Sequence, residues 1–156
     1  MRRRNLLGIA LSWQMALTVR AAPDSRLPVA LSLKDELAAA LRLAQPLVVM
    51  VSLEGCPFCR VVREHHLLPL RQEGQPIVQV DMRSDARVLD FAGQSRSHDE
   101  LVRAWNVVSA PTLLFLGKGA REVAPRLQGS SIPDFYGAYL EQRIQVARLD
   151  ITAAHR

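Results

Sequence analysis

A chain of 156 residues can bury one ordinary hydrophobic core without covalent cross-links, and its two cysteines, only three residues apart, would close a loop too short to hold a fold together. The chain is basic, with 20 Lys+Arg against 15 Asp+Glu, but four of the basic residues lie in the first 21 positions, which contain no acid. The remaining 16 basic and 15 acidic residues nearly balance, and no basic block with interleaved aromatic residues follows. The composition therefore excludes a nucleic-acid-binding protein.

The N-terminal segment has the pattern of an export signal. Arginines at positions 2–4 precede a mostly apolar run over 6–19, and small residues follow, so we predict a signal peptide over 1–21 that is cleaved near Ala21 or Ala22. The apolar run is shorter than the roughly 20 residues needed to span a bilayer, so no stable membrane span is expected after cleavage. An uncleaved anchor is the alternative, while a lipoprotein is excluded because the segment has no cysteine. Export would place the protein in the periplasm or another oxidising compartment.

The first predicted elements are a helix and a buried strand. Residues 22–31 are interpreted as a short extended lead-in. Ser32 is a helix N-cap, and leucines at helical spacing predict a helix over 33–44. The continuous apolar run 47–53 is rich in β-branched residues, which is typical of a strand covered by helices on both faces of a sheet.

A second helix follows this strand directly. The pattern changes from strand to helix after Gly55, and Pro57 suits the first turn because its missing N–H has no partner there. We predict a helix over 57–72, kinked by Pro69 and ended at Gly74.

The middle of the chain predicts a strand, a loop and a helix. Residues 76–82 form the next strand, which gives the strand–helix–strand unit of a parallel pair. The serine-rich polar stretch after it is expected to be a loop with a loose helical turn near 88–91. Ser97 is the N-cap of a further helix, on which His98 is expected at the surface and Trp105 in the core.

The last third of the chain predicts two paired strands and a long helix. The segment 110–112, Ala-Pro-Thr, precedes an apolar strand over 113–116, and a glycine turn leads to an antiparallel strand over 122–127. Ser131 is expected to cap the final helix. The residues of this helix expected to face inward are Phe135, Tyr139, Ile144 and Leu149.

The two cysteines form a C-x-x-C motif at the start of the second helix. The helix N-terminus lowers the pKa of the first thiol, so Cys56 is the predicted nucleophile, and Cys59, one turn later, is placed to resolve a mixed disulfide. A metal site is the alternative, but it needs more ligands, and only His65 and His66 lie nearby, pointing in different directions. We therefore expect no metal and no cofactor, only a redox-active Cys56–Cys59 disulfide.

The order of elements resembles the thioredoxin-like family. The resemblance rests on the motif 56–59, Cys-Pro-Phe-Cys, directly after the strand 47–53, and on Ala-Pro-Thr at 110–112 before the strand 113–116. It implies an α/β fold over 32–150, in which a central mixed β-sheet is flanked by helices on both faces. A short C-terminal tail of six residues would follow.

The resemblance also implies the roles of the site residues. In thioredoxin-like proteins the proline that matches Pro111 is cis and lies beside the active cysteines. A substrate segment would then pair with the backbone of Ala110 and contact Pro111 and Phe58. The alternative is that Phe58 is an aromatic side chain that partly covers the motif, without contact to a partner. Pro57 supports the helix start but has no N–H to offer the Cys56 thiolate, so we expect moderate thiolate stabilisation.

Three positions depart from the typical family pattern. Gly55 stands where a tryptophan precedes the first cysteine, and Pro57-Phe58 replaces Gly-Pro between the cysteines. Met50 stands where thioredoxins have a buried acid that assists proton transfer. Glu54 is closer to the motif and is interpreted as a solvated loop acid, with proton transfer as the alternative. Because Phe58 can neither donate a hydrogen bond nor carry charge, the motif favours a reducing or exchanging role over an oxidising one.

The sequence thus predicts an exported thiol:disulfide oxidoreductase. An oxidase or isomerase of the same fold, and a non-catalytic binding module with a permanently closed disulfide, are the alternatives. The expected partners are disulfide-containing exported proteins and a membrane electron donor, with no nucleic acid, and the chain is expected to be a monomer. Exported proteins of this kind serve cytochrome c maturation, sulfur-compound oxidation or general disulfide repair, and no residue selects among these substrates.

Overall fold

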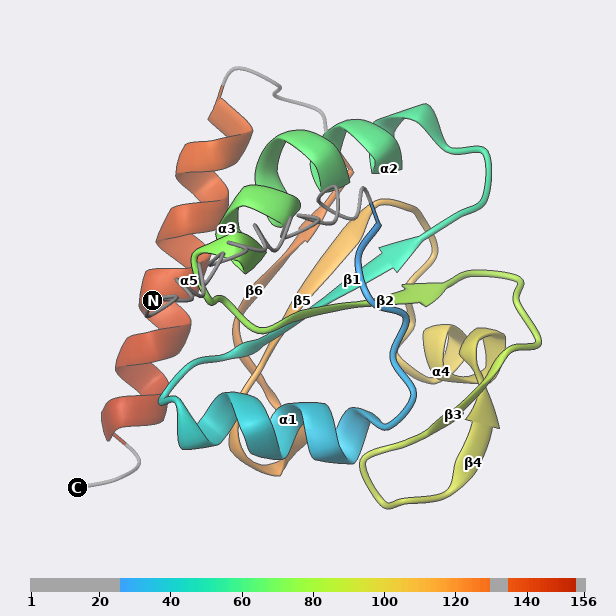
Figure 1. Ribbon diagram of the computed structural model, residues 1–156, viewed down its shortest axis with the longest axis horizontal. Helices are drawn as coiled ribbons and strands as arrows, with labels where there is room; N and C mark the ends of the chain where they lie inside the picture. The colour runs from blue at the N-terminus through green and yellow to red at the C-terminus, as the bar shows by residue number, and fades with distance from the viewer. Residues whose placement is uncertain (1–25, 130–134, 154–156) are drawn as a thin grey trace, which may run out of the picture.

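The centre of the molecule is a four-stranded sheet, shown in Figure 1. Its strands are β1 (Leu47–Ser52), β2 (Ile77–Asp81), β5 (Thr112–Leu116) and β6 (Glu122–Gln128). The spatial order is β2-β1-β5-β6; β1 is parallel to β2 and antiparallel to β5, which is in turn antiparallel to β6. This computed structural model describes residues 26–129 and 135–153. The predicted mixed sheet is confirmed.

Helices cover both faces of the sheet, as predicted (Figure 1). The helices are α1 (Leu33–Arg42), α2 (Pro57–Val62), η1 (Arg63–Leu67), α3 (Leu68–Gln72), α4 (His98–Ala104) and α5 (Tyr136–Ala153). One buried cluster joins α1 and α4 to one face, and another joins α2, η1 and α5 to the opposite face. In the described chain, no helix is long and apolar enough to cross a membrane.

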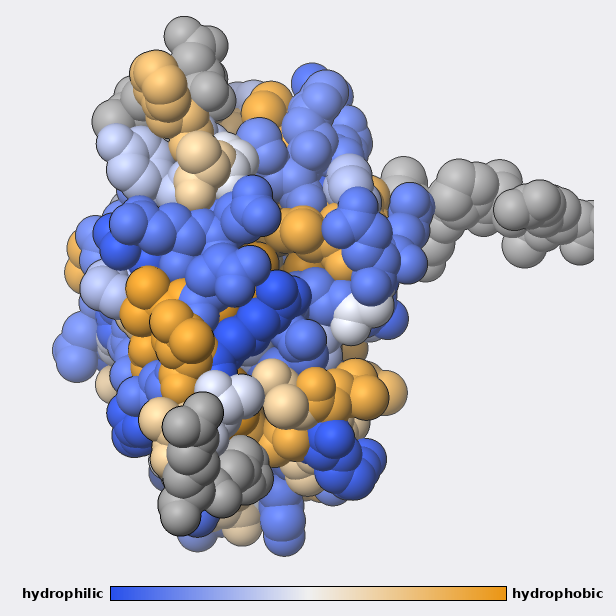
Figure 2. All heavy atoms as spheres, turned by 90° about the vertical axis from the view of Figure 1, so that its left-hand side faces the viewer, coloured by the Kyte–Doolittle hydropathy of each residue, from blue (hydrophilic) through white to orange (hydrophobic). Residues whose placement is uncertain are grey.

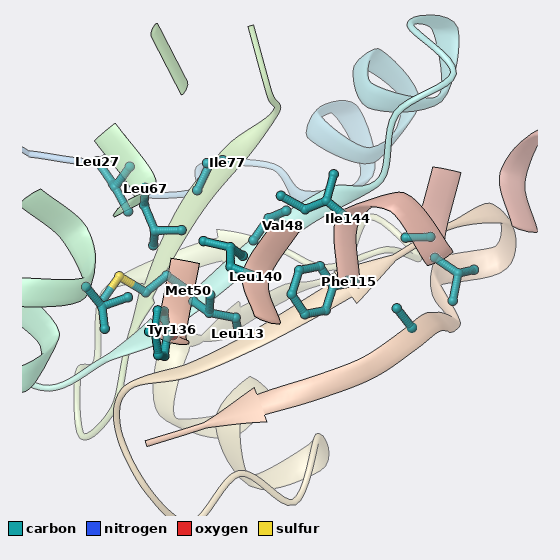
Figure 3. Close-up of a cluster of buried hydrophobic side chains, with 14 of the residues drawn as sticks. Leu27, Val48, Met50, Leu67, Ile77, Leu113, Phe115, Tyr136, Leu140 and Ile144 are labelled. Carbon is teal, nitrogen blue, oxygen red and sulfur yellow. The ribbon is translucent and has the colours of Figure 1, made fainter. Parts of the chain in front are cut away.

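The apolar run of β1 supplies both clusters. Val48 and Met50 belong to the cluster beneath α2 and α5, whereas Leu47, Val49 and Val51 belong to the cluster beneath α1. Successive side chains of a strand point to opposite faces, so a strand with helices on both sides needs apolar residues on both faces, which residues 47–51 provide. All six residues of β1 are buried, and Figure 3 shows Met50 within the first cluster.

The lead-in segment closes one edge of the sheet. The N–H of Gln79 in β2 donates to the carbonyl of Pro28 at 2.9 Å, and the N–H of Ala30 donates to the carbonyl of Gln79 at 3.0 Å. Residues 28–30 therefore lie parallel to β2 as a short bridge. This contact protects an edge that would otherwise present unpaired backbone groups.

The helix that follows the cysteines is less regular than predicted. Residues 57–72 are helical, but the turn over Arg63–Leu67 has π geometry and divides the helix into α2, η1 and α3. The irregularity thus precedes Pro69 instead of starting at it. Pro69 has no N–H to donate to the carbonyl four residues earlier, so the regular α-helical pattern is interrupted upstream of the proline.

The polar stretch before α4 was wrongly predicted as a loop with a helical turn. It forms a small hairpin of β3 (Arg87–Leu89) and β4 (Ser95–Ser97). The carboxylate of Asp90 accepts the N–H groups of Ala92 and Gln94 at 2.9 and 2.8 Å and so closes the turn. Such side-chain turns leave no hydrophobic periodicity in the sequence.

The start of α4 is confirmed, but its first residue was misplaced. Ser97 caps the helix and forms a capping box with Glu100, which satisfies two otherwise unpaired N–H groups. His98 is fully buried, not at the surface, and its Nδ1 accepts the N–H of Asp81 at 3.1 Å. Trp105 is half-buried and packs against the cluster beneath α1 and α4.

The inward face of α5 differs from the prediction by about one residue. Phe135, Tyr139 and Leu149 are exposed, whereas Ile144 is buried as expected. The face that packs on the sheet consists of Tyr136, Leu140, Ile144, Ala147 and Ile151. The helix has apolar residues on both sides, so its hydrophobic periodicity did not identify the side that is buried. Figure 2 shows the face of the molecule on which α5 lies, and apolar residues are present on that outer surface. The predicted cap at Ser131 lies outside the described residues.

Candidate active site

The C-x-x-C motif lies at the junction between β1 and α2. After Ser52 the chain turns through Gly55, whose φ of +71° favours glycine. Cys56 is the N-cap of α2, and its Sγ accepts the N–H of Cys59 at 3.1 Å. Pro57 occupies the first helical turn, where its missing N–H leaves no carbonyl unpaired. The N–H of Cys59 is therefore the backbone donor that lies at the first sulfur.

The two cysteines form a disulfide and differ in exposure. Their Cα atoms are 5.3 Å apart. Cys56 is half-buried, whereas Cys59 is 0% exposed and packs in the cluster with Met50 and Val62. A partner can therefore reach the sulfur of Cys56 but not that of Cys59.

A second loop brings Ala110 and Pro111 to the same place. The Ala110–Pro111 peptide bond is cis, as the family resemblance implied. The carbonyl oxygen of Ala110 lies 4.0 Å from the Sγ of Cys56. On the far side, the carbonyl of Pro111 accepts the N–H of Gly129 at 2.7 Å, which ties this loop to the end of β6. Residues 54 positions apart in the sequence thus meet at the reactive sulfur.

Exposed apolar side chains stand at the start of α2 and on the loop before Pro111. Phe58, between the cysteines, is 61% exposed. Val108, two residues before Ala110, is 86% exposed. Sequence reasoning identified Phe58 but missed Val108, because a single apolar residue in a loop carries no pattern.

Comparison with known proteins agrees with this geometry. The family model described as a thioredoxin-like domain matches residues 33–144, which is most of the chain. The chain belongs to the thioredoxin-like family. No curated protein sequence matches it.

Solved structures with this fold have low sequence identity to the thioredoxin-like chain. A thioredoxin from Thermus thermophilus is 21% identical with a TM-score of 0.53, over 84% of this chain and 95% of its own. The oxidoreductase DsbH is 14% identical with a TM-score of 0.51, over 87% of this chain and 96% of its own. At such identities the likeness concerns the fold alone.

This thioredoxin-like chain has Met50 at the position where the family resemblance implied a buried acid. Met50 is 0% exposed, and Figure 3 shows its side chain in the apolar cluster that also holds Tyr136. Glu54 is exposed and lines a surface groove that Cys56 also lines. The buried centre of the site therefore has no carboxylate at the family position.

Polar side chains that the sequence analysis missed form a chain beside the motif. Arg63 donates through Nε to Oε1 of Gln79 and through Nη2 to Oγ of Ser52, both at 3.0 Å. The amide nitrogen of Gln79 donates to Oδ1 of Asp81 at 2.7 Å. Two features of the sequence could have indicated this chain of side chains. Arg63 follows Cys56 at i+7, on the same helix face, and Gln79 and Asp81 are polar residues in an otherwise apolar strand.

His66 packs against Tyr136 and is not part of this polar chain. The rings of His66 and Tyr136 have centroids 5.0 Å apart, and burial, followed by the charge of His65, lowers the pKa of His66. Burial raises the pKa of the Tyr136 hydroxyl. Among the described residues, no group of three or more His, Cys, Asp or Glu side chains is placed to hold a metal ion.

Proposed function

We propose that this protein is an exported thiol:disulfide oxidoreductase that reduces or exchanges disulfides of partner proteins. The observation that supports it most is the unequal exposure of the two sulfurs at a helix start. Cys56 is accessible at the N-cap, and Cys59 is buried directly behind it. A dithiol arranged in this way attacks through one sulfur and resolves through the other.

The reaction begins from the reduced dithiol. The Cys56 thiolate attacks one sulfur of a partner disulfide, so a Cys56–partner bond forms, the partner disulfide breaks, and the second partner sulfur leaves as a thiolate. Cys59 then loses its proton and attacks the Cys56 sulfur. The partner leaves fully reduced with two electrons, and the Cys56–Cys59 disulfide forms.

The surroundings of Cys56 stabilise its thiolate only moderately. The N–H of Cys59 and the positive end of the helix favour the charged form. Pro57 has no N–H, and Phe58 offers neither a donor nor a charge. A moderately stabilised thiolate is a better reductant than a strongly stabilised one, which favours reduction or exchange over oxidation.

The backbone beside the cysteines suits a partner segment in extended conformation. Ala110 and Pro111 lie next to the Cys56 sulfur, where a substrate strand would pair with the backbone of Ala110. Phe58 is exposed at the same place and would contact the partner through its ring.

The cellular setting follows from the N-terminal pattern. Residues 1–21, which lie outside the described residues, have the charge and apolar run of a cleavable signal. The proposed partners are therefore disulfide-containing exported proteins. We propose that the protein acts on them as a monomer in the periplasm. An exported reductase also needs a source of electrons, for which we propose a membrane donor.

Replacing the resolving cysteine tests the catalytic function. A Cys59→Ser variant should accumulate mixed disulfides between Cys56 and exported proteins, visible as thiol-sensitive bands on non-reducing gels. The matched control is Cys56→Ser, which should form none because Cys59 is buried. If neither variant forms mixed disulfides, both the reductase and the oxidase interpretations fail and a non-catalytic binding module remains.

A further inference from the structure

A groove beside Cys56, whose lining does not include Ala110, carries most of the charged residues near the site. It has a volume of about 910 Å³ and runs from Cys56 past the ends of β1 and β2 to the lead-in segment. Its cationic lining residues are Arg26, Arg60, Arg63 and Arg83. This volume is in the range of sites that take a small ligand or a short peptide segment.

Arg63 is held in this groove by neutral groups. Its Nε and Nη2 donate to Gln79 and Ser52, at 3.0 Å each, so the guanidinium has a fixed position. Neither acceptor is charged, and the side chain is half-buried. A guanidinium fixed in this way keeps its full charge for an incoming anion and loses little side-chain freedom on binding.

The helix geometry directs a row of arginines toward the groove. Arg60 and Arg63 follow Cys56 at i+4 and i+7, so all three lie on one helix face. The π turn begins at Arg63, and such turns are frequent at functional sites. Within the part of the chain that the structure describes, no ion pair includes Arg60, Arg63 or Arg83.

Acidic residues of the groove do not neutralise this row directly. Asp81 accepts the amide of Gln79, so the Gln79 side chain stands between the carboxylate and Arg63. Glu54 and Glu64 are exposed and also line the groove. Glu54 and Glu64 therefore weaken the attraction of the whole groove for anions. The attraction for a carboxylate is strongest at Arg60 and Arg63, which form no ion pair among the described residues.

We infer that this groove selects disulfide substrates that carry an acidic residue close to the reacting cysteine. The substrate sulfur meets Cys56, and the neighbouring carboxylate accepts hydrogen bonds from Arg63 and Arg60 in the groove. Pairs of guanidinium and carboxylate are strong and geometrically specific, because two parallel N–H donors face two oxygens. The inference rests on the proposed reductase function and names the class of partner that it serves.

Two matched peptides test this selectivity. Each is closed by one disulfide, and they differ only in whether glutamate or glutamine flanks the cysteines. The reduced full chain should reduce the glutamate peptide at least about 5-fold faster at low salt, and the difference should shrink as salt screens the charges. Arg63→Gln should lose the preference, and Arg42→Gln, an exposed arginine outside the groove, should keep it.

Arg60→Gln gives a second variant, since Arg60 is exposed and its replacement leaves no buried group unpaired. It should reduce the preference even if Arg63→Gln lowers the thermal midpoint. Equal rates for both peptides with the unmodified chain would overturn the inference and leave the proposed function standing.

A binding measurement separates the two proposals. The same peptides with serine in place of cysteine are titrated into the oxidised full chain, and the Arg63 Nε–H signal is followed by NMR. The glutamate peptide should shift this signal and the glutamine peptide should not. If neither disulfide peptide is reduced but the shift occurs, the proposed function fails and the groove remains a carboxylate site. If the Arg63 signal does not move, the groove inference is wrong.

Discussion

His98 illustrates how one buried side chain links the fold to pH. It is fully buried at the start of α4, and its Nδ1 accepts the N–H of Asp81 at the end of β2. Burial lowers the pKa of His98, while the nearby Asp81 carboxylate and the backbone of Ala30 act in the opposite direction. The native state therefore holds a neutral imidazole at a pH where the unfolded chain already binds a proton.

The protein should lose stability as the pH falls below about 6.5, the ordinary histidine value. Under these conditions the unfolded state binds more protons than the native state, so the free energy of unfolding decreases. Urea unfolding between pH 7.5 and pH 5.5, chosen above the range where most carboxylates titrate, measures this slope. His98→Gln should reduce it, leaving the part due to His66, whose pKa burial also lowers.

The comparison variant is His65→Gln: His65 is exposed, and its replacement removes only the smaller, charge-derived part of the shift of the His66 pKa, so it should change the slope less than His98→Gln does. A slope that is unchanged in His98→Gln would show that another group controls the pH dependence. At pH 7.5, His98→Leu should cost about 1–3 kcal/mol, since the partly buried N–H of Asp81 loses its acceptor.

At the scale of elements, the sequence was most informative where one physical requirement dominates. The uninterrupted apolar run of β1 predicted a central strand, and Ser97 predicted a helix start, because burial on two faces and N-capping each require particular residue types. The β3–β4 hairpin was missed because its turn depends on the Asp90 carboxylate and not on periodicity.

The candidate site also has a part that the sequence predicted and a part that it did not. Cys56, Ala110 and Pro111 were predicted together from two short motifs, and the structure brings them together. The Arg63–Gln79 contact joins a helix to a neighbouring strand, so it depends on packing that no local pattern records.

Helix α5 provides a test of which face supports the sheet. Leu140→Ala should cost about 2–5 kcal/mol, because Leu140 is 1% exposed in the cluster beneath the helix and its removal leaves a cavity. Leu149→Ala is the matched control: Leu149 is 70% exposed, and its replacement should change stability by less than about 0.5 kcal/mol. Similar losses for both variants, measured by urea unfolding, would contradict the register of α5 described above.

At the scale of the whole molecule, the reduction potential of the disulfide and the folding stabilities of the oxidised and reduced forms are thermodynamically linked. Oxidation and unfolding form a closed cycle, so the reduction potential of Cys56–Cys59, relative to the unfolded chain, equals the difference in stability between the oxidised and reduced proteins. A difference of 30 mV corresponds to about 1.4 kcal/mol. Strong oxidants of this kind are more stable when reduced, because the folded protein stabilises their thiolate.

We expect the opposite here: the oxidised protein should be at least as stable as the reduced one. The N–H of Cys59 already contacts the Cys56 sulfur in the disulfide form, so on reduction the thiolate gains only the stronger attraction of this N–H and of the helix dipole for a negative charge, and nothing from Pro57 or Phe58. Urea midpoints of the two forms measure the difference, and equilibration with glutathione should independently give a potential near or below about −200 mV. A reduced form that is more stable, together with a potential near about −120 mV, would assign the protein to the oxidants. Because the cycle must close, a disagreement between the two measurements would show that the unfolded reference state, and not the site, differs between the two forms.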